Sequence, residues 1–104
     1  MFIAVYRWTV KKGREEAFVG AWHRGTVSIT KIYQSYGSRM HRAGNGDFIG
    51  YAQWPDRAAW EAAERAGFRH DDKEAARIFY DAIESSDTML LMDVVDDLLE
   101  LRRP

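Results

Sequence analysis

Hydrophobic positions divide this chain into segments with two different periods. Residues 2–10 are apolar at both alternating sets of positions, which predicts a central strand covered on both faces. From residue 14 to residue 36, aromatic and branched side chains recur at spacings of three and four, so we expect a long helix over 14–36. Gly37 is the expected end of that helix, just after its last turn.

The middle of the chain reads as a hairpin followed by a short helix. Residues 38–43 and 47–54 have the composition of strands, and the Gly-Asn-Gly turn at 44–46 has the residues that short hairpin loops need. Asp56 follows a proline and precedes an apolar-periodic stretch, so it is the expected N-cap of a helix over 57–66.

The last third predicts one more helix and one more strand. A helix over 73–85, capped by Asp71 or Asp72, precedes a continuous apolar run at 88–95. A run of this length predicts a strand buried on both faces. Residues 96–104 then prolong it into a C-terminal arm, whose apolar members are Leu98, Leu99 and Leu101.

The resulting order, β-α-β-β-α-α-β, is the split βαβ, ferredoxin-like pattern with one extra helix, an α+β fold with an antiparallel sheet. In that fold the helices cover one face of the sheet. The first and last strands here are apolar on the opposite face too, and large exposed apolar faces are rare on monomers. The pattern therefore predicts a homodimer whose sheets pack face to face, with the C-terminal arm contacting the partner subunit.

Composition narrows the function classes. The 104 residues predict a single domain, 1–104. Cysteine is absent, which excludes disulfides, thiolate metal sites and cysteine nucleophiles and fits a cytoplasmic protein. A net charge of −1 with interleaved signs gives no nucleic-acid surface, and no apolar run reaches membrane-spanning length. An aromatic fraction of 13%, including four Trp, indicates a pocket for a flat ligand, an oligomer interface, or both.

Arg7 and His41 are the first two candidates for chemistry. Arg7 interrupts the apolar first strand on the face of Ile3 and Val5. It either reaches the strand end or pairs with a carboxylate such as Asp93, or else it faces a pocket as a buried cation that holds an anionic oxygen. His41 lies on the first hairpin strand, where simple exposure and a base near neutral pH are the two readings.

Aromatic and histidine side chains supply the other candidates. Trp60, on the short helix, either covers the core or borders a pocket, and His70, in the link that follows, projects into a cleft or into solvent. Trp22 belongs to the apolar stripe of the long helix, and Tyr51 lies on the second hairpin strand. The chain has no His-Glu-x-x-His, Gly-x-Ser-x-Gly, Walker or Rossmann motif, so metal hydrolysis, triad hydrolysis and nucleotide chemistry are not indicated.

Three stretches carry a resemblance to a known family. The sequences at 11–18 (KKGREEAF), 37–39 (GSR) and 52–60 (AQWPDRAAW), together with the first strand, resemble the antibiotic biosynthesis monooxygenase family, and the similarity extends to about residue 66. Members of that family fold as a dimeric α+β barrel. Some are cofactor-independent monooxygenases that oxidise phenolic polyketides such as anthrones.

The resemblance implies a cofactor-independent monooxygenase that acts on a small aromatic or quinone-forming molecule. Arg7 would stabilise the substrate anion and His70 would be the base, while aromatic side chains would hold a flat ring. The implied residues are Arg7, Trp60 and His70 for catalysis, and Trp22, His41 and Tyr51 for substrate binding.

Two alternatives stay open at this level. Haem-degrading relatives carry an Asn on the first strand, a Trp on the helix after the hairpin and a His further along. Trp60 and His70 match the last two, while Arg7 stands at the Asn position, and haem would then be the cofactor. The other alternative is a dimeric module that binds a small ligand without turning it over.

Overall fold

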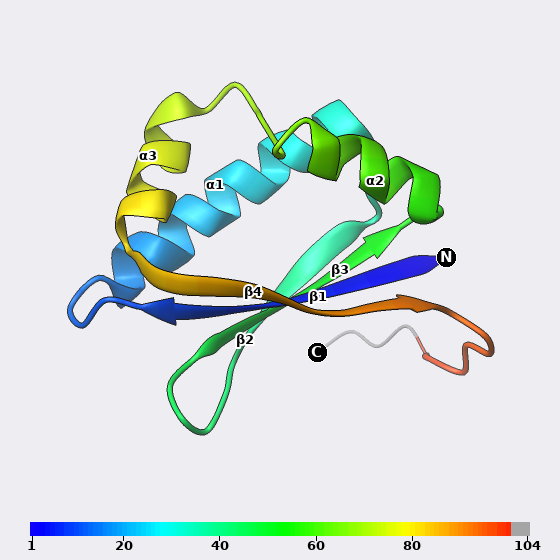
Figure 1. Cartoon of the computed structure of the whole chain (residues 1–104), viewed down its shortest axis with the longest axis horizontal. Helices are drawn as coiled ribbons and strands as arrows, with labels where there is room; N and C mark the ends of the chain where they lie inside the picture. The colour runs from blue at the N-terminus through cyan, green and yellow to red at the C-terminus, as the bar shows by residue number, and fades with distance from the viewer. Residues whose placement is uncertain (101–104) are drawn as a thin grey trace.

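The structure is a computed structural model that describes residues 1–100. One antiparallel sheet has the strand order β2-β3-β1-β4, and the helices lie along one side of it (Figure 1). The predicted α+β, ferredoxin-like fold is therefore confirmed. The elements are β1 (Phe2–Val10), α1 (Glu15–Tyr33), β2 (Gly37–Arg42), β3 (Phe48–Trp54), α2 (Arg57–Arg65), α3 (Lys73–Asp81) and β4 (Ile83–Asp93).

The short helices begin at their predicted caps. The Asp56 side chain accepts a hydrogen bond from the Ala59 backbone N–H at 2.8 Å, which satisfies a donor that the first turn of α2 leaves free. Asp72 does the same for α3 through the Ala75 N–H at 3.0 Å, so of the two predicted caps the second is used.

The predicted ends of two helices were wrong, and the last strand begins at Ile83 and not at residue 88. Helix α1 ends at Tyr33, and Gln34, not Gly37, is the left-handed residue that stops it, with φ of 58°. Helix α3 ends at Asp81 instead of residue 85, because the chain has already joined the sheet: Ile83 pairs with Val10 in β1. Sheet pairing therefore overrides the helical spacing of the apolar residues there.

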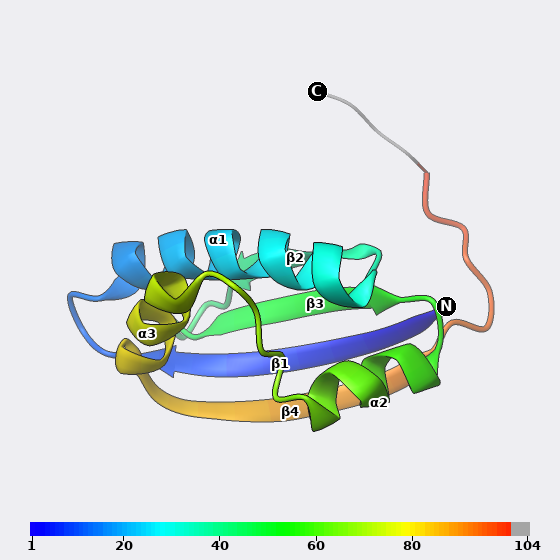
Figure 2. The same cartoon turned by 90° about the horizontal axis from the view of Figure 1, so that it is seen from above.

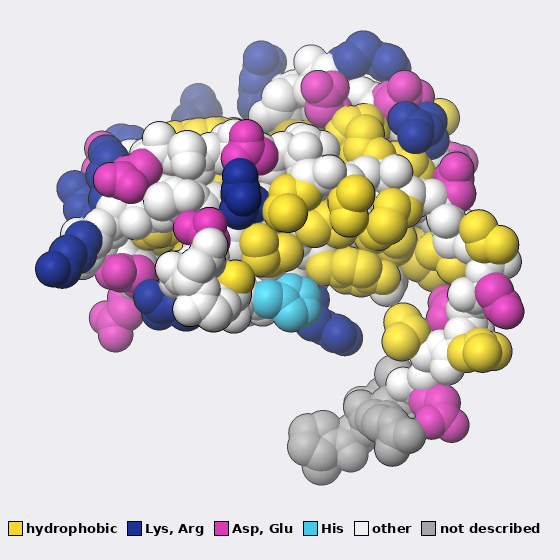
Figure 3. Space-filling model, turned by 60° about the horizontal axis from the view of Figure 1, so that its bottom comes forward, with side chains coloured by type: hydrophobic (Ala, Val, Ile, Leu, Met, Phe, Trp, Pro, Cys, Tyr) yellow, Lys and Arg dark blue, Asp and Glu magenta, His cyan; other side chains and the backbone are white. Residues whose placement is uncertain are grey.

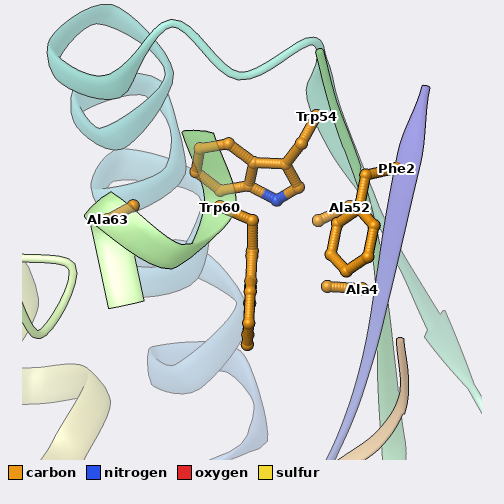
Figure 4. Close-up of a cluster of buried hydrophobic side chains, with 6 residues drawn as sticks. All are labelled: Phe2, Ala4, Ala52, Trp54, Trp60 and Ala63. Carbon is orange, nitrogen blue, oxygen red and sulfur yellow. The ribbon is translucent and has the colours of Figure 1, made fainter. Parts of the chain in front are cut away.

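The helix-facing side of the sheet forms the core. In β3 the alternate residues Phe48, Gly50, Ala52 and Trp54 are all buried, and the register places them opposite the even-numbered residues of β1. Figure 4 shows one buried group, in which Trp54 from β3 and Trp60 from α2 converge. The remaining labelled members of that group are Phe2, Ala4, Ala52 and Ala63.

The opposite side of the sheet carries no helix (Figure 1), although Ile3 on that side is only 3% exposed. We call it the open face; by strand alternation it carries Ile3, Val5, Ile49, Leu90 and Met92. Figure 3 shows apolar side chains gathered on the side of the molecule turned toward the viewer. The prediction that the last strand is buried on both faces was wrong for the single chain, since β4 is an edge strand whose Leu90 is 52% exposed.

The chain leaves the sheet after β4 and extends away from it (Figure 2). Leu98 and Leu99, in the predicted arm, are 85% and 78% exposed. Leu101 and the rest of the predicted arm up to residue 104 lie outside the described residues. The arm's contact with a partner subunit stays a prediction.

Candidate functional site

A cavity of about 720 Å³ lies between the sheet and the helices, and this volume falls in the range of small-molecule sites. Its floor is formed by β1 and β3, where Tyr6 and Trp8 stand beside Gly50. Helix α1 contributes Trp22 to the wall, and the link between α2 and α3 contributes His70. Aromatic and small residues therefore dominate the lining, as expected for a flat organic ligand.

The floor depends on the absence of a side chain at Gly50. A Cβ built there would lie 2.7 Å from two atoms of the Trp8 ring, which is closer than such atoms approach in proteins. The Trp8 ring also contacts Phe18 and Phe79, each with a centroid separation of 5.7 Å. The indole is therefore held between β3, α1 and α3.

Tyr6 and Trp60 form a polar pair beside the cavity. The Trp60 Nε1–H donates to the Tyr6 hydroxyl at 2.7 Å. Burial raises the pKa of the Tyr6 phenol above its ordinary value, although the bond from Trp60 acts in the opposite direction, so the hydroxyl stays protonated at neutral pH. Because that oxygen already accepts from Trp60, and its proton has no acceptor among residues 1–100, the O–H is available to a ligand.

His70 occupies the turn before α3. Its Nδ1 accepts a hydrogen bond from the Asp72 backbone N–H at 3.2 Å. Its Nε2 lies 3.2 Å from the position that a Cβ would take on Gly25 of α1. Both edges of the imidazole are therefore defined by contacts with the two helices that border the cavity.

The structure brings three of the predicted site residues to one region. Trp22 and His70 line the cavity. Trp60 is buried behind the wall, and its hydrogen bond to Tyr6 is its link to the cavity. The catalytic role of Trp60 stays a prediction, and its observed contact with the site is the hydrogen bond to the Tyr6 hydroxyl.

The structure places Arg7 and His41 elsewhere. The Arg7 guanidinium donates to the Asp87 carboxylate at 2.9 Å on the open face, and both side chains are about half exposed (43% and 54%). The carboxylate partner is thus Asp87 and not Asp93. His41 is exposed on the edge strand β2, where its Nδ1 lies 3.1 Å from the Ile49 carbonyl oxygen. Reaction roles for these two residues stay predictions and would require a ligand at the open face or the β2 edge.

Tyr51 borders the cavity at β3 between Gly50 and Ala52. Strand alternation directs its side chain to the open face, opposite Arg39 of β2 and Val5 of β1. The Tyr51 side chain therefore points away from the cavity floor, and its role in substrate binding stays a prediction.

Tyr6, Trp8 and Trp54 are site residues that the sequence reasoning missed. The available signal was a strand in which two aromatic residues flank Arg7 on one face. Across the sheet, Tyr6 is paired with Gly50 and Trp8 with Phe48. Trp54 also lines the cavity, and its buried Nε1–H is the one buried side-chain polar atom of residues 1–100 that lacks a hydrogen-bond partner. Because this nitrogen atom has almost no exposed surface, its N–H faces the packed core and lies out of reach of a ligand in the cavity.

Haem does not fit the residues present. An axial imidazole needs a ring nitrogen whose lone pair is free to bind iron. His70 Nδ1 accepts a bond from the Asp72 N–H, so the neutral ring carries its proton on Nε2 and offers no free lone pair. Within residues 1–100, no group of three or more histidine or acidic side chains is arranged to hold a metal ion. No helix in that range is long and apolar enough to cross a membrane.

Comparison with known proteins identifies the fold. No protein-family model and no curated protein matches the sequence. Among solved structures, SnoaB, a cofactor-independent oxygenase from Streptomyces nogalater, is 19% identical, with 95% of this chain and 97% of that chain covered and a TM-score of 0.71. A protein from Bordetella bronchiseptica assigned as an antibiotic biosynthesis monooxygenase is 13% identical, with coverage of 90% and 96% and a TM-score of 0.72.

A NIPSNAP domain protein from Burkholderia xenovorans has a similar backbone, with 12% identity, 96% and 100% coverage and a TM-score of 0.67. Proteins with different names thus share this architecture, and a fold alone does not define an activity. At these identities the comparisons establish architecture: the chain has the fold of the antibiotic biosynthesis monooxygenases.

Proposed function

We propose that the protein is a cofactor-independent monooxygenase acting on a small, flat aromatic molecule with an ionisable phenol or enol. The observation that carries this proposal is the cavity of about 720 Å³, with aromatic walls and the unshared Tyr6 O–H at its floor. The similarity to SnoaB, a cofactor-independent oxygenase, supports the same class of reaction.

The polar groups at the cavity are better suited to bind an anion than to accept a proton from the substrate. The one acidic residue that borders the cavity, among the described residues, is Asp87, and its carboxylate is paired with Arg7 on the open face. Tyr6 offers an O–H donor at the floor, whereas the unpaired Nε1–H of Trp54 is fully buried and does not face the cavity. Preorganised donors in a site that excludes water stabilise developing negative charge strongly. We therefore assign the Tyr6 O–H to binding the oxygen of the substrate anion.

The chemistry needs no group beyond the substrate and dioxygen. A ketone whose CH₂ group is conjugated with the carbonyl through aromatic rings, as in an anthrone, loses a CH₂ proton to solvent. It becomes a phenolate-type anion that is rich in electrons at that carbon. Reaction with O₂ forms a C–O bond and a peroxide, which takes up a proton. Loss of water then leaves a carbonyl, so that R₂CH₂ and O₂ give R₂C=O and H₂O. The substrate carbon is oxidised, and the second oxygen atom is reduced to water.

Oxygen uptake with an anthrone as substrate tests the proposal. We expect uptake by the wild type and a loss of about tenfold or more in kcat/KM for Tyr6→Phe, because a hydrogen bond to the anion is removed. Tyr36→Phe is the matched control, since Tyr36 is 61% exposed and does not line the cavity. Arg7→Gln should also keep its activity if the reaction takes place on the helix-facing side.

Each contrary outcome has a distinct meaning. Loss of uptake in Arg7→Gln but not in Tyr6→Phe would move the reaction to the open face and overturn the assignment of the cavity. Binding of the anthrone without oxygen uptake would favour a module that holds a ligand without turning it over. If no member of a panel of phenols and hydroquinones binds or supports oxygen uptake, the proposal is wrong.

We also infer that the working form is a cytoplasmic homodimer. The support is the apolar open face, where Leu90 and Met92 are 52% and 37% exposed, and the exposed Leu98 and Leu99 of the arm. A charged residue at the centre of such an interface opposes association, so Leu90→Lys should be a monomer by light scattering. A monomeric wild type at micromolar concentration would contradict the inference.

A further inference from the structure

Two neighbouring residues of α1, Arg24 and Gly25, hold the corner of the chain that carries His70. Arg24 Nε and Nη2 donate to the two carboxylate oxygens of Asp72 at 2.9 and 2.8 Å, and Nη1 donates to Glu74 at 3.1 Å. A bidentate arginine–carboxylate pair sets orientation as well as distance. The start of α3 is thereby tied to the middle of α1.

Asp72, held by Arg24, in turn fixes the orientation of His70. Its carboxylate caps α3 through the Ala75 N–H at 3.0 Å, and its own backbone N–H donates to His70 Nδ1 at 3.2 Å. A nitrogen that accepts an N–H donor must present a lone pair. In the neutral imidazole the ring proton then resides on Nε2, because one ring nitrogen donates and the other accepts.

Gly25 completes the arrangement from the other side. It is buried, and a Cβ there would lie 3.2 Å from His70 Nε2 and 3.5 Å from Cε1. The imidazole therefore occupies space that any other residue at position 25 would crowd. Gly20, in the same helix, has open space around the corresponding position, so this close approach is specific to Gly25.

We infer that Arg24 and Gly25 are positioning residues that fix His70 as an Nε2–H donor at the cavity wall. The inference rests on the proposed function, in which donors hold the substrate anion. It also revises the sequence-based role of His70 as a base, because a base needs a free lone pair and the one on Nδ1 is engaged by Asp72. His70 then joins Tyr6 in stabilising the anion.

Long-range ¹H–¹⁵N NMR of ¹⁵N-histidine-labelled protein, without ligand and at alkaline pH where imidazoles are neutral, reads the tautomer directly. We expect a single Nε2–H form for His70. His41 gives the opposite expectation in the same spectrum, since its Nδ1 faces the Ile49 carbonyl oxygen, which only accepts. Replacing each histidine with glutamine assigns the signals.

Variants test the positioning role. Arg24→Gln and Gly25→Ala should each give His70 a mixture of tautomers and lower kcat/KM about tenfold. The matched controls are Arg14→Gln, which removes another α1–α3 bond, to Asp81 at 2.9 Å, and Gly20→Ala. Both should leave the His70 signal unchanged. Because exposed ion pairs contribute little to stability, Arg24→Gln should stay folded.

The outcomes separate this inference from the proposed function. A mixture of tautomers or an Nδ1–H form of His70 in the wild type overturns the inference, as does an unchanged His70 signal in Arg24→Gln. Oxygen uptake accompanied by such a spectrum would leave the monooxygenase proposal intact. A fixed Nε2–H form with no turnover of any substrate would support the positioning and count against the proposed function.

Discussion

Replacing Gly50 with alanine tests how tightly the cavity floor is built. The new Cβ would lie 2.7 Å from Cη2 and Cζ3 of Trp8. Carbon atoms prefer separations of about 3.5–4.0 Å, so the indole has to move by about 1 Å. Its neighbours resist that movement, because the rings of Tyr6 and Phe79 each lie 5.7 Å away, centroid to centroid.

The expected loss of stability follows from two opposing terms. Overpacking of a filled core costs about 1–3 kcal/mol. Alanine is better than glycine within a strand by about 0.5–1 kcal/mol, which offsets part of that cost. We therefore expect Gly50→Ala to lower the free energy of unfolding by about 0.5–2 kcal/mol, measured by urea denaturation at one fixed protein concentration.

Gly20→Ala is the matched control for this variant. Nothing lies within 4 Å of a Cβ at Gly20, so alanine there should stabilise the helix by up to about 1 kcal/mol. In a double-mutant cycle, Trp8→Phe should relieve the effect of Gly50→Ala, because the clashing atoms are removed. An unchanged or raised unfolding midpoint for Gly50→Ala would refute the packing argument.

Four further predictions concern single contacts. Tyr6→Phe leaves the buried Trp60 Nε1–H without an acceptor and should cost about 1–3 kcal/mol in urea, whereas no measurable loss would show that water replaces the hydroxyl. Asp56→Ala should cost about 1 kcal/mol by thermal circular dichroism, and an unchanged midpoint would contradict its capping role. Bonds from Arg24 hold the pKa of Asp72 below its ordinary value of 3.8, so its stabilisation is present above that pH and is lost as pH falls through the lowered pKa. The difference in melting temperature between wild type and Asp72→Asn should accordingly shrink only below about pH 4, and a difference that disappears near neutral pH would contradict that cause. Hemin should produce no saturable Soret shift, and a saturable shift would contradict the conclusion that His70 cannot serve as an axial ligand of haem.

Most of the fold could be predicted because local signals and packing agree. The turn at 44–46, the cap at Asp56 and the two-sided apolar pattern of β1 each point to the element that forms. The failures lie where tertiary pairing decides. Ile83 continues the helical spacing of α3, yet it joins the sheet opposite Val10, and no local signal marks that change.

The candidate site was predicted less well for a geometric reason. Both faces of β1 are apolar, so the sequence does not indicate which one the helices cover. Arg7 was chosen as the polar exception, while the helices cover the face of Tyr6 and Trp8. His70 and Trp22 were chosen from the sequence, and both line the cavity. They lie on the α2–α3 link and on the apolar stripe of α1, which border the cavity whichever face of β1 the helices cover.

Turnover of an anthrone by the purified protein under isotopically labelled dioxygen, with the product analysed by mass spectrometry, decides whether the protein is a cofactor-independent monooxygenase. We expect one labelled oxygen atom in each new carbonyl and one O₂ consumed per substrate, with no added cofactor. Product without the label, or turnover that appears only when a flavin, haem or metal ion is supplied, would contradict the proposal.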